Sequence, residues 1–302
     1  MTQPAKRAQS TARQRRWPFV LIFILGLLVI SYPLITRLYY ETDAAQLITD
    51  FETGRSALSE EEIAERLALA DGYNEALEAG TLSDPYTEQQ EAGVAEYARM
   101  LEVHERLGYV SIPKLAVDIP MYAGTSEVVL QKGIGHLEGT SLPVGGNSTH
   151  TVLTAHRGLP TARLFSELDQ MVVGDKFYIH NVAGVIAYQV DQITVVEPSD
   201  FSDLLVSPGH DYATLLTCTP YMINSHRLLV RGHRIEYVAA VEERHIAEQR
   251  VGYFYKWGFF VAAGLFLLTV LIALRGWMKR RRLVRHIRTL EAARVQHEDA
   301  EP

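Results

Sequence analysis

The sequence predicts a mainly β domain that follows a helical region and is flanked by two membrane-spanning helices. Three observations predict this architecture. Residues 108–240 contain short runs in which apolar and polar residues alternate, and turn residues separate these runs. Residues 37–107 are acidic and rich in alanine, with the spacing of apolar residues that is typical of helices. Two long apolar segments without charged residues lie outside these regions.

The predicted membrane spans are residues 17–36 and 255–275. Their apolar runs, 17–35 and 257–274, are each roughly long enough to cross a hydrocarbon core of ~30 Å. A cleaved signal peptide is the alternative for the first run, and a buried core helix is the alternative for the second. No small-residue cleavage site follows the first run, and the basic segment "MKRRRLVRHIR" follows the second, so the sequence favours two spans.

The basic residues predict how the chain crosses the membrane. Residues 1–16 have five Lys or Arg and no acidic residue, and residues 275–302 have eight against four acidic ones. Because short basic flanks stay in the cytoplasm, the tails 1–16 and 276–302 are predicted to be cytoplasmic and the β domain extracellular. The part between these flanks has 16 basic and 32 acidic residues, which is unlike a nucleic-acid-binding protein.

The part between the spans divides into the helical region, the β domain and a linker at 241–254. In the helical region, Ser59 and Glu62 have the spacing of a capping box, and a second helix is expected over 91–107. Many short strands at the spacing seen in the β domain are typical of an antiparallel sandwich or a closed barrel. Within that domain only "TARLFSELDQM", residues 161–171, has the pattern of a helix.

Cys218 is the only cysteine of the chain, so no disulfide can form within it. It ends the β-type run "ATLLTC", and an antiparallel return of the chain would bring Arg227 beside it. A guanidinium near a thiol lowers the pKa of the thiol and can hold a developing oxyanion. The simpler alternatives are a buried core cysteine and a surface arginine.

Nucleophilic chemistry at a thiol also needs a proton carrier, and histidine is the usual one. Among eleven histidines, His156 ends the apolar run "TVLTAH" directly before the turn "RGLP", where a strand end can display a functional side chain. His226 is its main rival because it is closer to Cys218 in the sequence. The spacing in the sequence does not decide which of the two histidines is the proton carrier. No cofactor motif or metal-ligand cluster is visible in the sequence, so no cofactor is expected.

The segment "TLLTC" resembles the Thr-Leu-x-Thr-Cys signature of sortases, the membrane-anchored cysteine transpeptidases of Gram-positive bacteria. The segments "TPYMINSHRLLVRGHR" and "TAHRGLPTARLFSELDQM" are similar to the pilin-polymerising class C sortases, and the similarity runs from about residue 37 to 275. It implies a closed sortase-type β-barrel of about eight strands. It also implies that Cys218, His156 and Arg227 are catalytic and that Thr217 supports them. Met222 departs from the family, since class C enzymes commonly have Gly there.

The resemblance implies a two-step transpeptidation. Cys218 would cleave an LPXTG-type sorting signal between Thr and Gly and form a thioester, and a lysine amine of another pilin subunit would resolve the thioester. His156 would transfer protons, and Arg227 would stabilise the oxyanion. The partners expected from the resemblance are such pilin subunits and membrane lipid, with no nucleic acid.

The segment "SDPY", residues 83–86, resembles the lid of class C sortases. This similarity implies that Asp84 pairs with Arg227 and that Tyr86, beyond Pro85, covers Cys218. We expect the pair to be partly exposed and therefore weak. A plain turn is the alternative, because Asp-Pro is common in turns. Two other functions stay open: a sortase that attaches proteins to peptidoglycan, and a non-enzymatic envelope protein that binds a partner.

Overall fold

The computed structural model describes residues 17–77, 82, 84, 86, 96–239, 241–244 and 246–248, and then 258, 261–262, 264–266, 268–270, 272 and 274–278. The chain divides into two compact units, Met1–Ala247 and Glu248–Pro302. The predicted tail 1–16 and nearly all of the tail 276–302 lie outside the described residues, and so does much of the predicted linker.

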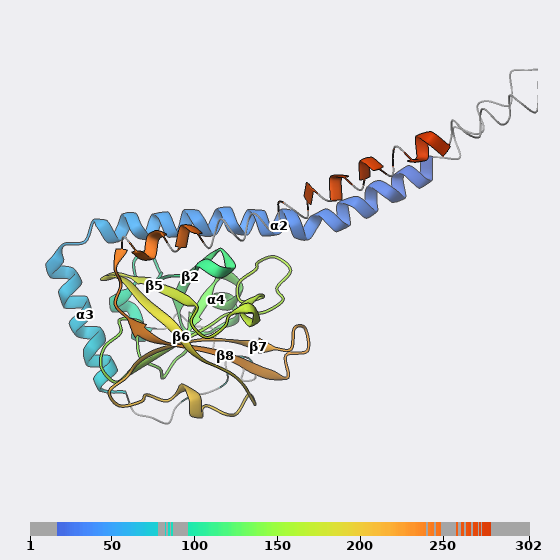
Figure 1. Ribbon diagram of the computed structural model, residues 1–302. Coiled ribbons are helices and arrows are strands. Elements are labelled where there is room, and N and C mark those ends of the chain that lie inside the picture. Colours follow the sequence, from blue (N-terminus) through green and yellow to red (C-terminus); the bar gives the residue numbers. More distant parts are fainter. Residues whose placement is uncertain are drawn as a thin grey trace, which may run out of the picture. The chain divides into compact units, whose positions relative to one another are not determined.

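Eight strands close into a barrel in the order β1-β2-β3-β4-β7-β8-β6-β5 (Figure 1). The strands are β1 (Gly108–Ile112), β2 (Val117–Ala123), β3 (Ile134–His136), β4 (Thr149–Thr154), β5 (Lys176–Asn181), β6 (Gly184–Val196), β7 (Asp211–Thr219) and β8 (His226–Ile235). Two of the pairs, β2–β3 and β4–β7, are parallel, and the other pairs are antiparallel. The expectation of a mainly β, closed barrel of about eight strands is confirmed, and the sandwich is excluded.

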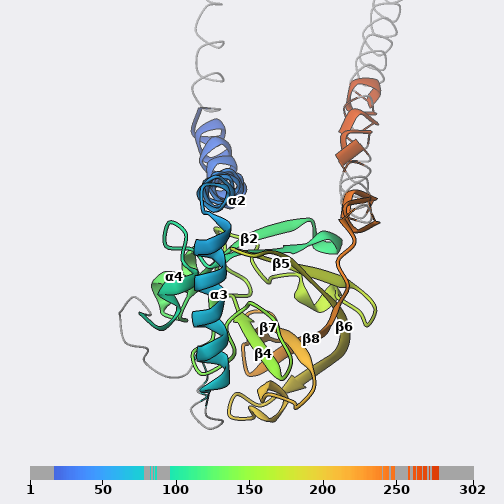
Figure 2. The same cartoon turned by 90° about the vertical axis from the view of Figure 1, so that its left-hand side faces the viewer.

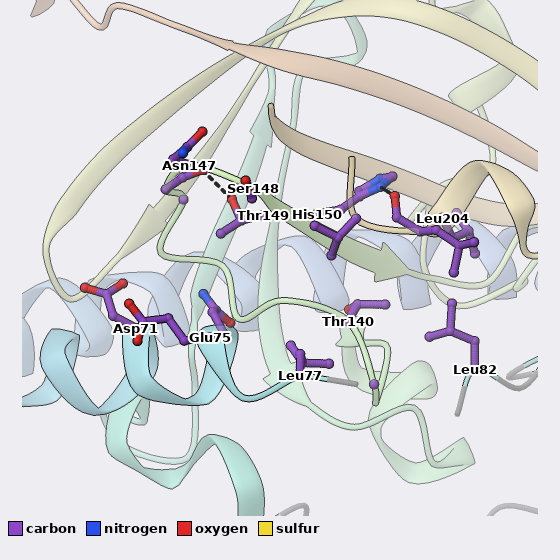
Figure 3. A pocket seen from close by; sticks show the side chains of 16 residues that line it. Asp71, Glu75, Leu77, Leu82, Thr140, Asn147, Ser148, Thr149, His150 and Leu204 are labelled. Atoms are coloured by element: carbon purple, nitrogen blue, oxygen red, sulfur yellow. Dashed lines mark hydrogen bonds between the residues drawn. The ribbon is translucent and has the colours of Figure 1, made fainter. Parts of the chain in front are cut away.

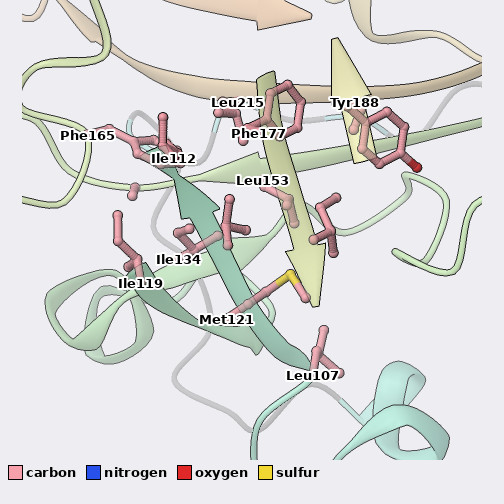
Figure 4. Packing of buried hydrophobic residues seen from close by; sticks show 14 of the residues in the cluster. Leu107, Ile112, Ile119, Met121, Ile134, Leu153, Phe165, Phe177, Tyr188 and Leu215 are labelled. Atoms are coloured by element: carbon pink, nitrogen blue, oxygen red, sulfur yellow. The ribbon is translucent and has the colours of Figure 1, made fainter. Parts of the chain in front are cut away.

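Successive residues of a strand point to opposite faces of the sheet. One face of each strand therefore points into the barrel, and apolar side chains on these faces fill its interior. Leu215 belongs to the main core, together with large side chains such as Phe177 and Tyr188 (Figure 4). The next residue, Leu216, belongs to a second cluster. We call this second set the outer cluster; its buried members are Leu137, Val152, Leu204, Leu216 and Leu229. Leu82 and Tyr86 pack against it, so a segment preceding the barrel in the sequence covers this part of the sheet.

The helical region contains α2 (Trp17–Ser56) and α3 (Glu60–Glu75). The predicted capping box is present: the Ser59 side chain accepts from the backbone N–H of Glu62, whose carboxylate accepts from the backbone N–H of Ser59. Helix α3 is attached to the barrel (Figure 2), because Asn74 Oδ1 accepts a hydrogen bond of 2.7 Å from the backbone N–H of Leu142. The remaining described helices are α4 (Glu127–Lys132), η1 (Glu96–Leu101), η2 (Pro113–Leu115), η3 (Leu168–Gln170) and η4 (Ser202–Leu204), the η elements being 3-10 helices.

Two helix predictions were wrong. Of the segment 161–171, only η3 is helical, because Leu164 has a φ of 39° and interrupts the right-handed conformation. Its apolar pattern arises from side chains that the core buries, Leu164, Phe165 and Leu168. Of the segment 91–107, residues 91–95 lie outside the described residues. Within the rest, η1 is a short 3-10 helix, and the chain then turns at His104 and Glu105, which both have positive φ.

Within the part of the chain that the structure describes, no helix has the length and apolar character needed to cross a membrane. The transmembrane helices predicted at 17–36 and 255–275 are therefore not supported. Residues 17–36 belong to α2, and the segment 255–275 lies partly outside the described residues.

Candidate active site

Cys218 and Arg227 lie directly opposite each other on the antiparallel strands β7 and β8. Directly opposed residues of such a pair project from the same face of the sheet, so the thiol and the guanidinium are neighbours. Both residues are buried, with 5% and 4% of their surface exposed. Burial raises the pKa of the Cys218 thiol to about 11; Arg227 and Arg157 oppose this rise, and Asp84 adds to it. In the observed arrangement the thiol is therefore protonated at neutral pH.

His156 lies at the end of the strand beside Cys218. Strand β4 runs parallel to β7 with Thr154 paired to Leu216, and the backbone N–H of Ala155 donates to the Leu216 carbonyl at 3.3 Å. His156 follows Thr154 by two residues, just as Cys218 follows Leu216 by two. The two residues therefore occupy equivalent positions after the paired residues of β4 and β7. The Nε2 atom of His156 is 3.3 Å from Oε2 of Glu127 on α4.

His226 is placed differently. It pairs with Thr219, the residue after Cys218, so its side chain leaves the sheet on the face opposite to Cys218 and Arg227. Its Nδ1 lies 2.9 Å from the hydroxyl of the neighbouring Ser225. The register thus distinguishes the two histidines, which sequence spacing could not do: His226 is on the face opposite to Cys218, and His156 follows the strand that pairs with β7.

Thr217 also projects away from Cys218 and connects two strands. Its fully buried hydroxyl donates to the Ala155 carbonyl at 2.7 Å. Ala155 precedes His156, so this hydrogen bond fixes the strand end that displays the imidazole relative to the strand of the thiol. The contact agrees with a supporting role and gives Thr217 no direct contact with a reacting group.

Asp84 forms a bidentate ion pair with Arg227. The Nε and Nη2 atoms of Arg227 donate to Oδ1 and Oδ2 of Asp84, each at 2.6 Å. Both side chains are 5% exposed, so the expectation of a partly exposed pair was wrong. The fit is bidentate, which is the strong geometry for a guanidinium and a carboxylate. An Asp-Pro turn by itself would not need these contacts.

Tyr86 covers the same site. Its hydroxyl is 2.7 Å from Oγ1 of Thr154 and donates to the Ala155 carbonyl at 2.8 Å. Its ring centroid lies 5.1 Å from Cζ of Arg227 and 5.7 Å from the centroid of the His156 ring. Burial, followed by the nearby Cys218, raises the pKa of the Tyr86 hydroxyl far above its ordinary value. Pro85, between the two contact residues, lies outside the described part of the chain.

The loop between β7 and β8 forms another side of the site. Met222 has a φ of 65° in this loop, in the left-handed region that favours glycine. The departure from the class C pattern therefore puts a side chain where the backbone favours Gly. The loop contacts the turn after His156, since a Cβ atom on Gly158 would be 3.2 Å from the Tyr221 ring and 3.3 Å from Sδ of Met222.

Two residues near the site, Arg157 and Glu127, were not predicted from the sequence. Arg157 is the residue directly after His156, and its side chain is only 6% exposed. The sequence "HRG" shows that an arginine follows the proposed proton carrier, but it does not show that this arginine is buried. Glu127 gives no sequence signal, because it lies 29 residues before His156 on α4, a separate short helix.

A pocket of about 640 Å³ lies at the other end of β4 and β7 (Figure 3). It is lined by Asp71, Asn74, Glu75, Leu77, Leu82, Gly139, Thr140, Gly145–His150 and Leu204–Val206. Thr149 and His150 begin β4, whereas His156 follows its end, so the pocket does not include the thiol site. Leu82 lines the pocket and also packs on the outer cluster with Tyr86. The segment around Asp84 therefore connects the pocket to the thiol site.

Residues 110–235 match the family model of the sortase domain. The chain is 62% identical to sortase C-1 (SrtC-1) from Streptococcus pneumoniae, covering 64% of this chain and 100% of that one with a TM-score of 0.63. It is also 62% identical to the pilus-related sortase C of group B Streptococcus, covering 63% and 97% with a TM-score of 0.61.

Among curated relatives, sortase A of Bacillus anthracis is 26% identical over 132 residues, which are 44% of this chain and 61% of that protein. Sortase A of Streptococcus agalactiae is 28% identical over 116 residues, which are 37% of this chain and 47% of that protein. The chain thus spans about half the length of the curated relatives that it matches.

Proposed function

The chain belongs to the sortase family of cysteine transpeptidases, and we propose that it is a pilin-polymerising, class C sortase. The main support for this proposal is the ion pair between Asp84 and Arg227, which lies opposite Cys218, because such a pair is expected of the lid in that class. The identity of about three in five residues to a sortase C-1 and a pilus-related sortase C supports the same class.

In the first half-reaction, the Cys218 thiol transfers its proton to His156 and the sulfur attacks the Thr carbonyl of an LPXTG-type sorting signal. Arg227 donates to the oxyanion of the tetrahedral intermediate. The imidazolium then protonates the leaving Gly amine, the Thr–Gly bond breaks, and a thioester remains. Asp84 occupies Nε and Nη2 of Arg227, so it must leave before these donors can reach the oxyanion.

In the second half-reaction, a lysine amine of another pilin subunit attacks the thioester. His156 removes the proton from the attacking amine and returns it to the departing Cys218 sulfur, so an isopeptide bond forms and the enzyme is regenerated. Glu127 lies within contact distance of Nε2 and orients the imidazole. Thr217 holds the strand end before His156 in place.

The test is a reaction of the full chain with an LPXTG peptide and a pilin that presents an acceptor lysine. We expect a thioester on Cys218, visible by mass spectrometry, and an isopeptide bond to the lysine. Persistence of the acyl-enzyme in Cys218→Ala would overturn the assignment of the nucleophile. Transfer to a peptidoglycan-type amine without transfer to the lysine would replace the polymerase by the wall-anchoring sortase, and absence of any acyl-enzyme would favour a binding protein.

We also infer that the enzyme is anchored to the cell membrane with its catalytic domain outside. This inference rests on the amino-acid pattern alone, namely the apolar runs 17–35 and 257–274 and the basic residues beside them.

A further inference from the structure

Arg157 connects the turn of His156 to the strand of Cys218. Its Nη1 atom donates to Oγ1 of Thr219 at 2.8 Å, and Thr219 is the residue after Cys218. Its Nη2 atom is 2.9 Å from Oδ2 of Asp169, and its Nε atom donates to the Ser166 carbonyl at 3.4 Å. The nitrogen atoms of the guanidinium thus bind groups on different segments of the chain. These contacts attach the residue next to His156 to the strand of Cys218.

The turn itself has further supports. The backbone N–H of Phe165 donates to the His156 carbonyl at 3.2 Å, and that of Gly158 donates to the Ser166 hydroxyl at 3.2 Å. Neither contact reaches β7. The side chains of Arg157 and Thr217 both form hydrogen bonds that join the residues flanking His156 to the nucleophile strand, and of these two residues only Arg157 is charged.

The charge of Arg157 does not depend on the lid. Arg227, on β8, is the cation directly opposite Cys218, and the Asp84 carboxylate pairs with its guanidinium. Arg157 contacts Thr219, Asp169 and the Ser166 carbonyl, none of which belongs to the lid. Its own counter-ion Asp169 has a side chain that is 53% exposed, so water screens that carboxylate. The positive charge near the thiol therefore persists whether the lid is closed or open.

We propose that Arg157 is a positioning residue of the transpeptidation, which ties the His156 turn to the strand of Cys218 and keeps a second positive charge at the residue next to the thiol. The proposal rests on the proposed function, since it assigns the nucleophile to Cys218 and the proton carrier to His156. The other groups that act on the thiol are Arg227 on β8, and Asp84 and Tyr86 of the segment 83–86, and the Tyr86 ring in turn contacts His156. The opposing effect of Arg157 on the pKa of the thiol agrees with this arrangement.

The experiment measures two quantities in a lid-opened background, Asp84→Ala with Tyr86→Ala, in the full chain. The first is the rate of Cys218 alkylation by iodoacetamide between pH 5 and 10, and the second is kcat and KM for an LPXTG peptide. Arg157→Gln should slow alkylation at pH 7 by roughly three- to tenfold and shift the profile to higher pH, because one cation near the thiolate is lost. It should also lower kcat with little change in KM.

Two variants separate charge from alignment. Arg157→Lys keeps the positive charge, so its alkylation profile should equal that of the lid-opened background. A lysine has no planar guanidinium that binds Thr219 and Asp169 at the same time, so kcat should be reduced. Arg163→Gln is the matched control, because Arg163 also donates to a carbonyl and a carboxylate, those of Leu115 and Glu167, which both lie outside β7. It should leave the alkylation profile unchanged.

The proposal is overturned if Arg157→Gln and Arg163→Gln give the same alkylation profile, or if Arg157→Lys keeps the full kcat. Should Arg157→Gln fail to fold, the Lys variant alone decides the alignment, through its kcat. Alkylation requires only the thiol and no sorting signal, so a wrong assignment of the substrate would leave this first readout intact. The two proposals can thus fail separately.

Discussion

Asp84 and Arg227, 143 residues apart in the sequence, form an ion pair in which both N–O distances are 2.6 Å and both side chains are 5% exposed. The pair is buried, so neither charge is solvated while the lid is closed. Removing one partner of such a pair costs ~3–5 kcal/mol, since the remaining charge is left buried and unpaired. If residues 83–86 act as a lid that leaves the site, as we propose, the remaining charge regains water. Loss of Asp84 should therefore open the lid and leave the barrel folded.

The first prediction is that Asp84→Ala with Tyr86→Ala increases the rate at which a bulky thiol reagent labels Cys218 by roughly tenfold or more, because labelling scales with the open fraction. Labelling is followed by mass spectrometry, and thermal unfolding checks that the barrel is intact. Asp71→Ala is a matched control, since Asp71 lies on α3 and lines the distant pocket. Equal labelling rates in the double variant and the parent would show that residues 83–86 are only a turn.

The second prediction concerns the proposed chemistry. Cys218→Ala should abolish acyl-enzyme formation, and Arg227→Ala should slow it by ~10²–10³, the usual effect of losing an oxyanion donor. His156→Ala should slow it by ~10²–10⁴, as expected for a lost acid–base group. His226→Ala is the control, because its side chain lies on the other face of β8 and should leave the rate nearly unchanged. Similar losses at both histidines would contradict the choice of His156.

The third prediction is a pH dependence. Cys218 is 5% exposed, and burial raises the pKa of its thiol to about 11 from an ordinary value of 9.0. The raised pKa means that the closed state retains the thiol proton, so opening the lid should become more favourable as the pH rises above the ordinary value. Opening also removes the Asp84 charge and the Tyr86 ring from the thiol, which should lower its pKa. Iodoacetamide labelling of the Asp84→Ala, Tyr86→Ala variant should therefore reach its half-maximal rate at lower pH than labelling of the parent. Identical midpoints would contradict this account of the thiol.

The fourth prediction concerns topology. If both ends of the chain are cytoplasmic, protease added to cells without their wall should digest residues 41–250 and spare a tag at either end. A matched sample of lysed cells should lose both tags. Digestion of a C-terminal tag in intact cells would contradict the two-span topology inferred from the sequence.

The barrel could be predicted from sequence better than its strand directions. Alternating runs identify strands, but the pattern is the same for parallel and antiparallel pairs, so the parallel pairs β2–β3 and β4–β7 were not foreseen. The second of these pairs brings the strand end before His156 next to the strand of Cys218. The apolar pattern of 161–171 misled, because three side chains that the core buries imitate a helical period.

The site residues were identifiable as candidates, but their mutual geometry was not. The sequence contains Cys218 and Arg227 at a plausible spacing, yet the register of β7 and β8 depends on the loop between them. The burial of the Asp84–Arg227 pair could not be predicted from the sequence either, since the two residues are 143 positions apart in the chain. Arg157 contacts Thr219, Asp169 and Ser166, and the residues next to Arg157 in the sequence do not predict these contacts.

The last prediction is that Met222→Gly stabilises the protein. Met222 has a φ of 65°, and a non-glycine residue in this conformation is strained by ~1–2 kcal/mol. Its side chain is 70% exposed, so little packing is lost when it is removed. Glycine loses more entropy on folding, by roughly 0.5–1 kcal/mol, which offsets part of the gain. We expect a net increase of about 0.5–1 kcal/mol in the free energy of unfolding, measured by denaturant titration. Ile223→Gly is the matched control: Ile223 is 71% exposed in the same loop and is not among the residues with positive φ, so its replacement should destabilise the protein. Destabilisation by both substitutions would show that the contact of Met222 with Gly158 outweighs the strain.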